Sequence, residues 1–520
     1  MLRLVSIAVL LPAWLTSMAA DHGWRITPNV APAATVPAAP DTQASPADVA
    51  PMDDAAPPAT TTAEERTAEK IRELTVRLGS RRPIDQFTAS VFGRPLTIGG
   101  EWVLEPRYQD NFNLDEADDD DRLRLDQELQ LEFTYPVNER LILFLEGKVL
   151  RRDDIYRDDD REESNTELQR GQSWVYLAPE AAGPFALQAG RQNINEPREW
   201  WWDEDLDAVR LHFRHRRVDF ELSIGEEAGT LTLGEDLDPE QKDVRRLLGR
   251  AGWTWLERQR LELYLLYQDD RSDLPIEGTV VPKTDRDESD ADLIWVGLRA
   301  TGRWKLDNGG RIYYWLDSAM VRGDELLVDY DSISDTESIV DDIDELQVRG
   351  WGLDAGATWS PPDTRLSFTL AFAHGSGDDD RRDDTDHAFR QTGLQNNDGK
   401  FRGVNRFRYY GEVLRPELSN LRLLTLSAGW RFWNRSSVEL LYHRYWQDKP
   451  APFLRDTSLN SDPAGDDDAL GDELDLVVGI EEWTHWDLEF IAAMFRAGRA
   501  FGEAEDEVAW GLFGKVKFYF

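Results

Sequence analysis

The sequence lacks cysteine and is poor in histidine and in basic residues for its length. Its 520 residues include no cysteine, which excludes disulfides, cysteine-ligated zinc and thiol catalysis. Seven scattered histidines leave little material for a histidine-based metal site. The 59 basic residues against 100 acidic ones give a formal net charge of −41. That charge excludes a nucleic-acid-binding function, because phosphate neutralisation needs a basic face. We expect no metal and no cofactor.

Long apolar runs are also scarce, and a short one stands at the N-terminus. Arg3 supplies a positive start, residues 4–16 are apolar, and residues 17–20 (SMAA) are small enough for cleavage. The run is shorter than the roughly 20 apolar residues that span a bilayer. Residues 1–20 are therefore predicted to be a secretory signal. No later segment is long and apolar enough to predict a transmembrane helix.

Residues 21–86 contain little to bury. Alanine and proline dominate residues 21–62, which predicts a disordered or polyproline-like periplasmic tether. Residues 63–78 favour a short helix with Ile71, Leu74 and Leu78 on one narrow face, and Pro83 ends it.

Aromatic residues, in contrast, are abundant. The chain has 20 Trp, 14 Tyr and 21 Phe, far too many for a disordered protein. Tryptophan and tyrosine beside so much charge are typical of a protein that meets both lipid and water.

Beyond residue 87 the hydrophobic pattern has a period of two. In residues 122–133 (RLRLDQELQLEF) the even positions are polar, and the odd positions are apolar except Gln127. After a turn, Leu143, Leu145 and Val149 share one face and Glu146 the other. Such segments run to 13 residues, against five or six for an ordinary strand, and at about 3.3 Å per residue they match a tilted membrane crossing.

Eighteen such segments follow one another, joined by alternately short and long connections. Short turns include YPVNER, KLDNG, WNRSS and EEWTHW, and residues 375–420 form one long outer loop. An even number of strands with this alternation is typical of bacterial outer-membrane barrels. We therefore predict that residues 87–520 are an all-β, transmembrane, antiparallel up-and-down β-barrel of 18 strands, located in the bacterial outer membrane. The predicted segments are 100–111, 121–133, 139–151, 167–178, 184–192, 206–214, 217–226, 243–256, 258–269, 290–302, 308–319, 346–358, 364–374, 421–433, 436–447, 470–483, 486–497 and 507–520.

The end of the chain supports this interpretation. Residues 508–520 alternate up to a terminal Phe520, and the final strand must pair with the first because lipid tolerates no open edge. An aromatic C-terminal residue resembles the signal that the barrel-insertion machinery reads. Lipid and lipopolysaccharide of the outer membrane are further expected partners.

Acidic residues gather in stretches that we expect to lie in long outer loops or at their edges. These are residues 116–121, 152–163 and 320–345, the last with ten acids against Arg322. A solvated rim explains them. Divalent cations that bridge loops or engage lipopolysaccharide are the alternative, although no stretch has the spacing of a defined calcium loop.

Basic residues are expected inside the barrel. Arg124, Lys148, Arg210 and Arg250 share the polar parity of their strands, where they either line a water-filled pore or form salt-bridge ladders. The long loop adds five arginines within 26 residues, which can bind carboxylates bidentately. They are Arg390, Arg402, Arg406, Arg408 and Arg415.

Residues 190–211 (GRQNINEPREWWWDEDLDAVRL) and 389–421 resemble the bacterial alginate export porin family of the outer membrane, with support from residues 441–446, 472–479 and 495–502. The resemblance implies an eighteen-stranded monomeric barrel with an arginine-rich constriction, acidic partners and a loop acting as a gate. By position, Arg170 and Arg191 look like constriction arginines, Asp203 like their acidic partner, and Arg406 and Arg408 like the family's loop arginines. Gly393, Leu394 and Asn396 look like residues that shape the loop.

The resulting hypothesis is an outer-membrane channel for passive export of an anionic exopolysaccharide, alginate or a similar polyuronate, delivered by periplasmic export proteins. A general anion-selective porin for small acidic solutes is the alternative, and a receptor or adhesin is a further one. We expect no enzyme, because neither His212 nor His443 has a serine motif beside it. The expected constriction set is Lys148, Arg170, Arg191, Asp203, Arg210, Arg390, Arg402, Arg406 and Arg408.

Overall fold

The computed structural model describes two stretches of the chain. They are residues 63–75 and 81–520, apart from 82, 84–85, 116, 118–120, 158–163, 181–182, 234–236, 238, 273, 335 and 380–382. The predicted signal (1–20) and the Ala/Pro-rich tether lie outside the described residues. In the helical region the structure has α1 (Ala63–Thr75), and Leu78 lies outside the described part. No described helix is long and apolar enough to cross a membrane.

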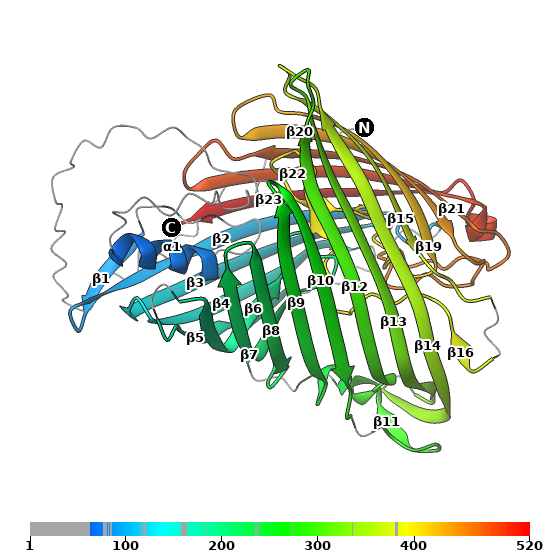
Figure 1. Ribbon diagram of the computed structural model, residues 1–520. Coiled ribbons are helices and arrows are strands. Elements are labelled where there is room, and N and C mark those ends of the chain that lie inside the picture. The colour runs from blue at the N-terminus through cyan, green and yellow to red at the C-terminus, as the bar shows by residue number, and fades with distance from the viewer. Residues whose placement is uncertain are drawn as a thin grey trace. The chain divides into compact units, whose positions relative to one another are not determined.

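Twenty-one strands form one sheet, and eighteen of them close into an antiparallel ring (Figure 1), which confirms the predicted barrel. The first half of the ring consists of β2 (Arg94–Asp110), β3 (Arg122–Asn138), β4 (Leu141–Arg157), β5 (Ser164–Leu177), β6 (Phe185–Asn195), β7 (Asp203–His215), β8 (Val218–Glu226), β9 (Arg245–Leu256) and β10 (Gln259–Asp269). The second half consists of β12 (Ser289–Lys305), β13 (Arg311–Ser332), β14 (Glu337–Ser360), β15 (Leu366–Gly375), β19 (Leu421–Trp430), β20 (Ser436–Gln447), β21 (Ala469–Ile480), β22 (Trp486–Ala497) and β23 (Val508–Tyr519).

The ring closes where β23 pairs with β2, from Glu101 opposite Tyr519 to Asp110 opposite Trp510. Short strands that are not members of the ring pair with its strands: β1 (Phe87–Val91) with β2, and β11 (Val280–Pro282) and β16 (Thr385–Asp386) with β14. The remaining small elements are the two-stranded pair β17 (Asp398–Gly399) and β18 (Phe407–Arg408) and the 3-10 turns η2 (Pro239–Gln241), η3 (Lys283–Asp285) and η4 (Arg499–Ala504).

The two faces of the strands differ as the alternation predicts. On β3 and β4 the exposed Leu131, Leu145 and Val149 point out of the ring, whereas Gln130 and Glu146 point inward and are buried. Because residues that pair across strands share a face, this assignment extends from strand to strand around the ring. The outer face is apolar and the inner face is mixed.

The acid-rich stretch 320–345 is not a loop, so this part of the prediction was wrong. β13 and β14 stay paired far beyond the neighbouring hairpins, up to Ser332 opposite Ser338. Apolar residues interleave with the acids, and Val328 and Val340 are buried, so the alternation itself continues the two strands. Residues 152–157 likewise belong to β4, while 158–163 and most of 116–121 lie outside the described residues.

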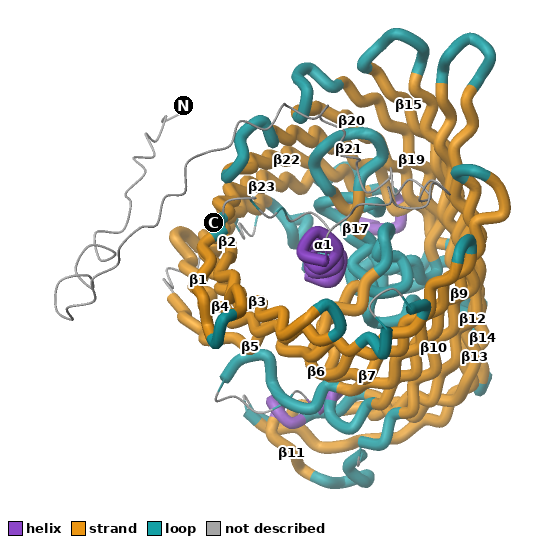
Figure 2. Tube along the Cα trace, turned by 60° about the vertical axis from the view of Figure 1, so that its left-hand side comes forward, coloured by secondary structure: helices purple, strands orange, loops and turns teal. Residues whose placement is uncertain are grey.

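Two connections fold into the ring, and Figure 2 shows loop segments inside the circle of strands. We call residues 196–202 the short inner loop and residues 376–420 the long inner loop. The long inner loop contains no barrel strand, as predicted for residues 405–412. Aromatic rings join the loops to each other and to the wall: Trp200 stacks on Phe389, and Trp201 lies parallel to Tyr264 at 4.9 Å. The hydrophobic core therefore lies inside the barrel.

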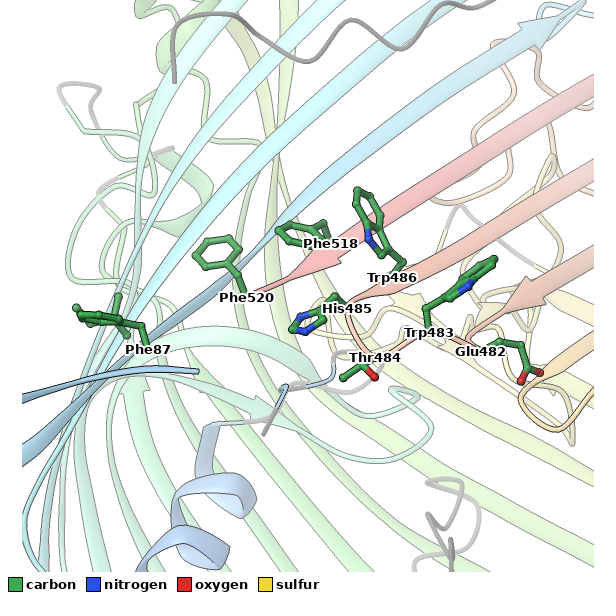
Figure 3. Close-up of a pocket in the computed structure, with 9 residues that line it drawn as sticks. Phe87, Glu482, Trp483, Thr484, His485, Trp486, Phe518 and Phe520 are labelled. Carbon is green, nitrogen blue, oxygen red and sulfur yellow. The ribbon is translucent and has the colours of Figure 1, made fainter. Parts of the chain in front are cut away.

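Aromatic side chains also collect at the end of the ring that carries the short turns. Phe87, Trp483, Trp486, Phe518 and Phe520 surround an open pocket there, together with His485 (Figure 3). Trp483 and Trp486 are 49% and 40% exposed. Such rings are favoured at the boundary between lipid and water, which is consistent with a membrane barrel.

Candidate functional site

The short inner loop is fixed to the wall by a buried network of charges. Arg198 donates to Asp317 of β13 at 3.0 Å and to Asp354 of β14 at 2.9 Å. Glu196 binds Arg299 of β12, which also donates to Asp317 at 2.5 Å. Removing one member would leave buried charges without a partner, so the network holds the loop in one position.

Aromatic contacts complete this anchor. The Arg198 guanidinium lies 4.5 Å from the ring centres of both Trp315 and Tyr409, a cation–π sandwich. Tyr409 belongs to the long inner loop, so Arg198 connects both inner loops to the wall. Sequence reasoning missed Glu196, Arg198, Arg299, Asp317 and Asp354, because their partners lie more than a hundred residues away or on separate strands.

The long inner loop has its own anchor on another part of the wall. Glu473 of β21 accepts backbone N–H groups of Glu412 at 2.6 Å, Val413 at 2.7 Å and Leu414 at 3.1 Å. Three successive amides on one carboxylate fix the backbone of this segment. The arginines just before and after it therefore stand on a rigid support.

Arg170 and Arg191, the predicted constriction arginines, lie together near the outer rim. Arg170 contacts Asp207 at 2.8 Å, and Arg191 contacts Glu227 at 3.2 Å and Asp207 at 3.6 Å. Arg191 is 1% exposed at its side chain and Arg170 28%. We call these four residues the rim cluster. It holds two positive and two negative side chains.

The register places the rim cluster on the outward-facing parity of the wall. Arg191 pairs across the strands with Ser173 and Asp207. It lies on the same face of β6 as exposed Leu187, and buried Gln188 lies on the other face. A bulge opposite Glu146 turns Arg170 the same way, and its guanidinium donates to the carbonyl of Gly229 in the loop after β8. The structure thus brings the two arginines together, but separates them from the arginines of the long inner loop.

Other wall residues point into the lumen and are paired. Lys148 lies 3.7 Å from Glu146 and 3.9 Å from Glu128, and Arg210 lies 2.6 Å from Glu221. Arg124 and Arg250 also contact carboxylates, Asp126 at 2.8 Å and Glu221 at 3.1 Å respectively. These residues line the lumen and form ladders at the same time, so the two interpretations are compatible.

Three arginines of the long inner loop are bound within the protein. Arg390 contacts Asp386 at 2.7 Å as well as Glu325 of β13. Arg406 binds Glu199 of the short inner loop and the backbone carbonyl of Asp398 at 2.6 Å. Arg402 lies 4.1 Å from the ring centre of Tyr313. Arg406 thus joins the two inner loops, and Arg390 and Arg402 hold the long inner loop to β13.

Arg408 and Arg415 differ from all of these. Within the described part of the chain, neither guanidinium has a carboxylate oxygen within 4.0 Å, although the Arg408 guanidinium donates to the carbonyl of Asn396 and its backbone N–H donates to Glu412 at 2.9 Å. The pKa of Arg415 is lowered to about 10 by burial and by the positive charges of Arg408 and Arg107, although Glu412 opposes this. Two neighbouring guanidiniums that form no ion pair, and are opposed at longer range by Glu412, favour the binding of an anion. We call Arg408 and Arg415 the loop pair.

Asp203 lies between the two inner loops rather than beside the rim arginines. It accepts hydrogen bonds from Asn193 at 3.2 Å and Asn396 at 2.9 Å, and its backbone N–H donates to Leu394. Asn396 and Leu394 therefore shape the loop by contacts with the wall, and Gly393 supplies a positive φ of 72° beside them.

One arrangement resembles a catalytic triad but cannot work as one. Thr425 lies 2.9 Å from Nδ1 of His443, and Nε2 of His443 lies 3.4 Å from Asp475. The side chains of His443 and Asp475 are 0% and 2% exposed, so no substrate atom can reach them. Among the described residues no group of three or more acidic or histidine side chains is arranged to hold a metal ion.

Comparison with known proteins finds a family match and curated relatives. The family model described as "Alginate export" matches residues 94–514. The alginate production protein AlgE of Pseudomonas aeruginosa is 27% identical over 326 residues, which cover 62% of this chain and 65% of that protein. AlgE of Azotobacter vinelandii is 25% identical and covers 59% and 64% respectively. The alignments thus span about two thirds of these relatives, slightly less in each case.

Solved structures share the fold. OccK1 (OpdK) of Pseudomonas aeruginosa superposes with a TM-score of 0.50 at 11% identity, over 81% of this chain and 98% of that one. At that identity the likeness concerns the barrel architecture alone. The family match and the barrel fold place the protein in the bacterial outer membrane. They also agree with the expectation that it is not an enzyme.

Proposed function

Because the chain belongs to the alginate export family, we propose that it is an outer-membrane channel through which an anionic exopolysaccharide, alginate or a similar polyuronate, leaves the cell passively. The observation that carries the proposal is the loop pair. The guanidiniums of Arg408 and Arg415 stand inside the barrel without an ion pair, whereas Lys148, Arg210 and Arg250 on the lumen wall each contact a carboxylate. The names of the relatives, alginate production proteins, support a polyuronate as cargo.

The mechanism follows from the strength of the contacts. A uronate carboxylate forms bidentate hydrogen bonds with a guanidinium, which is the geometry that arginine favours. Transport also requires release, so each contact must be weak enough to exchange with the next. The paired residues on the lumen wall, Lys148 and Arg210 among them, offer such partial contacts because their own carboxylates compete with the polymer.

The rim cluster has a supporting role in this proposal. Arg170 and Arg191 are bracketed by Asp207 and Glu227, which stabilises the outer end of β5–β7 and the loop after β8. We assign the selective step to the loop pair, with Arg406 and Asp203 holding the loops that present it. Arg390 and Arg402 belong to the same supporting set.

A general anion-selective porin is the alternative, because the loop pair would attract a small acidic solute as well as a polymer. The two functions separate in planar-bilayer conductance of the purified protein. An anion-shifted reversal potential in a salt gradient, with block by polymannuronate at concentrations where a monomeric uronic acid has no effect, supports the exporter. Equal effects of monomer and polymer would favour the porin, and a cation-selective pore indifferent to polymer would overturn both.

A further inference from the structure

A helix lies inside the ring at the end that carries the short turns (Figure 2). Ile71 and Leu74 of α1 pack against a buried cluster that includes Phe144, Trp174 and Tyr176. Glu73 forms an ion pair of 2.7 Å with Arg214 at the end of β7. Lys70 lies 5.6 Å from the ring centre of Tyr176. The helix therefore touches β4, β5 and β7 from within the lumen.

The wall beneath α1 is unusual for a surface that lines water. Phe144 and Trp174 stack at 5.0 Å with an interplanar angle of 21°, and Ile142 is 0% exposed. These residues face the lumen, as do the polar side chains Glu146 and Gln172. Glu146 and Gln172 are the next inward-facing residues along β4 and β5, further from the short turns. An apolar patch here is stable in water only when something covers it. In this structure the cover is α1.

Charges continue from the patch into the barrel. Arg214, His212 and Arg210 follow one another on the inward face of β7, with Glu221 paired to Arg210. Tyr176 lies 6.4 Å from His212, ring centre to ring centre. The patch and this row together present aromatic rings beside a guanidinium. Sugar rings stack on aromatic faces, and a uronate adds a carboxylate for the guanidinium.

The helix is held by contacts that can exchange. The side chains of Arg214 and Glu73 are 55% and 38% exposed, so their ion pair is screened by solvent. A helix of 13 residues is marginal alone and depends on its two apolar contacts. Beyond it, Arg81 donates to the backbone carbonyls of Trp483 at 3.0 Å and Trp486 at 3.1 Å, on another part of the ring. Arg81 thus has its own attachment to the ring, which does not depend on the contacts of α1.

We propose that Phe144, Trp174, Tyr176 and Arg214 form a saccharide-binding site for a uronate unit at the short-turn mouth, and that α1 occupies this site as an internal competitor. Glu73 takes the position on Arg214 that the uronate carboxylate takes when the polymer arrives. Binding of polymer and docking of α1 then exclude each other. The proposal rests on the proposed function for the identity of the ligand.

The test compares two charge reversals on the same helix. Glu73→Lys repels Arg214, whereas Glu69→Lys makes the same change at an exposed residue that the described structure does not pair. Binding of immobilised oligomannuronate to the purified full chain is measured by interferometry. If α1 covers the site nine-tenths of the time, its release tightens binding about tenfold. We expect that gain for Glu73→Lys and none for Glu69→Lys.

A second change identifies the site itself. Arg214→Gln, added to Glu73→Lys, should abolish the gain, and folding is little at risk because the Arg214 side chain is half exposed. Equal effects of the two helix variants, no gain with Glu73→Lys, or a gain that survives Arg214→Gln would each overturn the proposal.

The outcome is separable from that of the proposed function. Conductance block by polymer depends on the loop pair and is measured with Arg415→Gln. If polymer blocks the wild-type channel but Glu73→Lys binds no better, the export function stands and the α1 site fails. If Glu73→Lys gains affinity through Arg214 but polymer never blocks conductance, the site stands and the proposed cargo path fails.

Discussion

The rim cluster and the loop pair show how differently two groups of arginines can be used in one barrel. Arg170 and Arg191 each have a carboxylate within 3.2 Å, and both lie on the outward parity of adjacent strands. In the described chain the guanidiniums of Arg408 and Arg415 have none within 4.0 Å, and they stand on a loop inside the ring. Paired arginines stabilise structure, whereas uncompensated ones attract anions. Substituting an arginine should therefore lower stability in the rim cluster and weaken anion binding in the loop pair.

The largest effect is expected from reversing the buried arginine of the rim cluster. Arg191 contacts both Asp207 and Glu227, so Arg191→Glu would remove their shared positive partner and place a third carboxylate beside them. Breaking a buried pair in this way costs about 3–5 kcal/mol. The heat-dependent mobility shift of the folded barrel in gel electrophoresis should then occur at a lower temperature. Channels that still fold should keep their ion selectivity; a changed reversal potential in a stable barrel would place Arg191 in the conduction path.

Next in size is the effect of neutralising the loop pair. Arg408→Gln with Arg415→Gln should cost little stability, since no ion pair is lost and only the hydrogen bond from Arg408 to the Asn396 carbonyl disappears, but should weaken anion preference. Loss of about 1.4 kcal/mol of attraction for a uronate corresponds to a tenfold rise in the polymer concentration that halves conductance. Arg499→Gln is the matched control, because Arg499 is exposed on an outer loop and pairs only weakly with Asp467. If Arg499→Gln raised the blocking concentration as much, the loop pair would have no special role in binding the polymer.

A smaller effect on conductance is expected where both inner loops meet the wall, although the loss of stability there follows the same rule as for Arg191. Arg198→Met keeps much of the volume but leaves Asp317 and Asp354 without this partner. The long inner loop should become more mobile through its contact at Tyr409, which would appear as brief closures in single-channel recordings. Steady current together with normal stability would show that the buried network does not position the loops.

The smallest expected effect concerns pH and α1. Burial raises the pKa of Glu73, but Lys70 and Arg214 lower it further, so that it falls below the ordinary 4.5. A lowered carboxyl pKa stabilises docking above the ordinary value, and this stabilisation is lost as pH falls through the lowered pKa. The contribution is below about 1 kcal/mol because the pair is exposed. With Glu69→Cys labelled, fluorescence anisotropy of α1 should fall at acidic pH, and the addition of Glu73→Gln should remove this dependence.

Much of the architecture could be predicted from local patterns. Alternation in residues 122–133 indicates β3, its face and its length, because a strand half in lipid must keep its apolar side chains on one side. The same rule, applied too narrowly, misplaced residues 320–345, where apolar residues between acids continue β13 and β14. The long inner loop was recognised because the short-turn parity leaves room for only eighteen strands in the ring.

The candidate site was only partly predictable. Family resemblance indicated Arg170 and Arg191, but the bulge on β5 opposite Glu146 and the register of β6 decide which face they occupy. The spacing of residues in the sequence does not predict that Glu196 contacts Arg299. Nor does it predict that Arg406 forms an ion pair while Arg415 forms none in the described chain. Helical periodicity indicated Ile71 and Leu74, but not that their partners would be Phe144 and Trp174 on the wall.

By itself, then, the sequence determined the strands, their inward and outward faces, and the closure of β23 on β2, because each follows from the side-chain period of a strand in lipid. The tertiary structure alone decided which arginines are neutralised, how the two inner loops fill the ring, and where α1 docks. These depend on contacts between residues far apart in the chain, such as Glu73 with Arg214 and Arg198 with Asp354. A local pattern supplies the side chain, and the closed barrel supplies its partner.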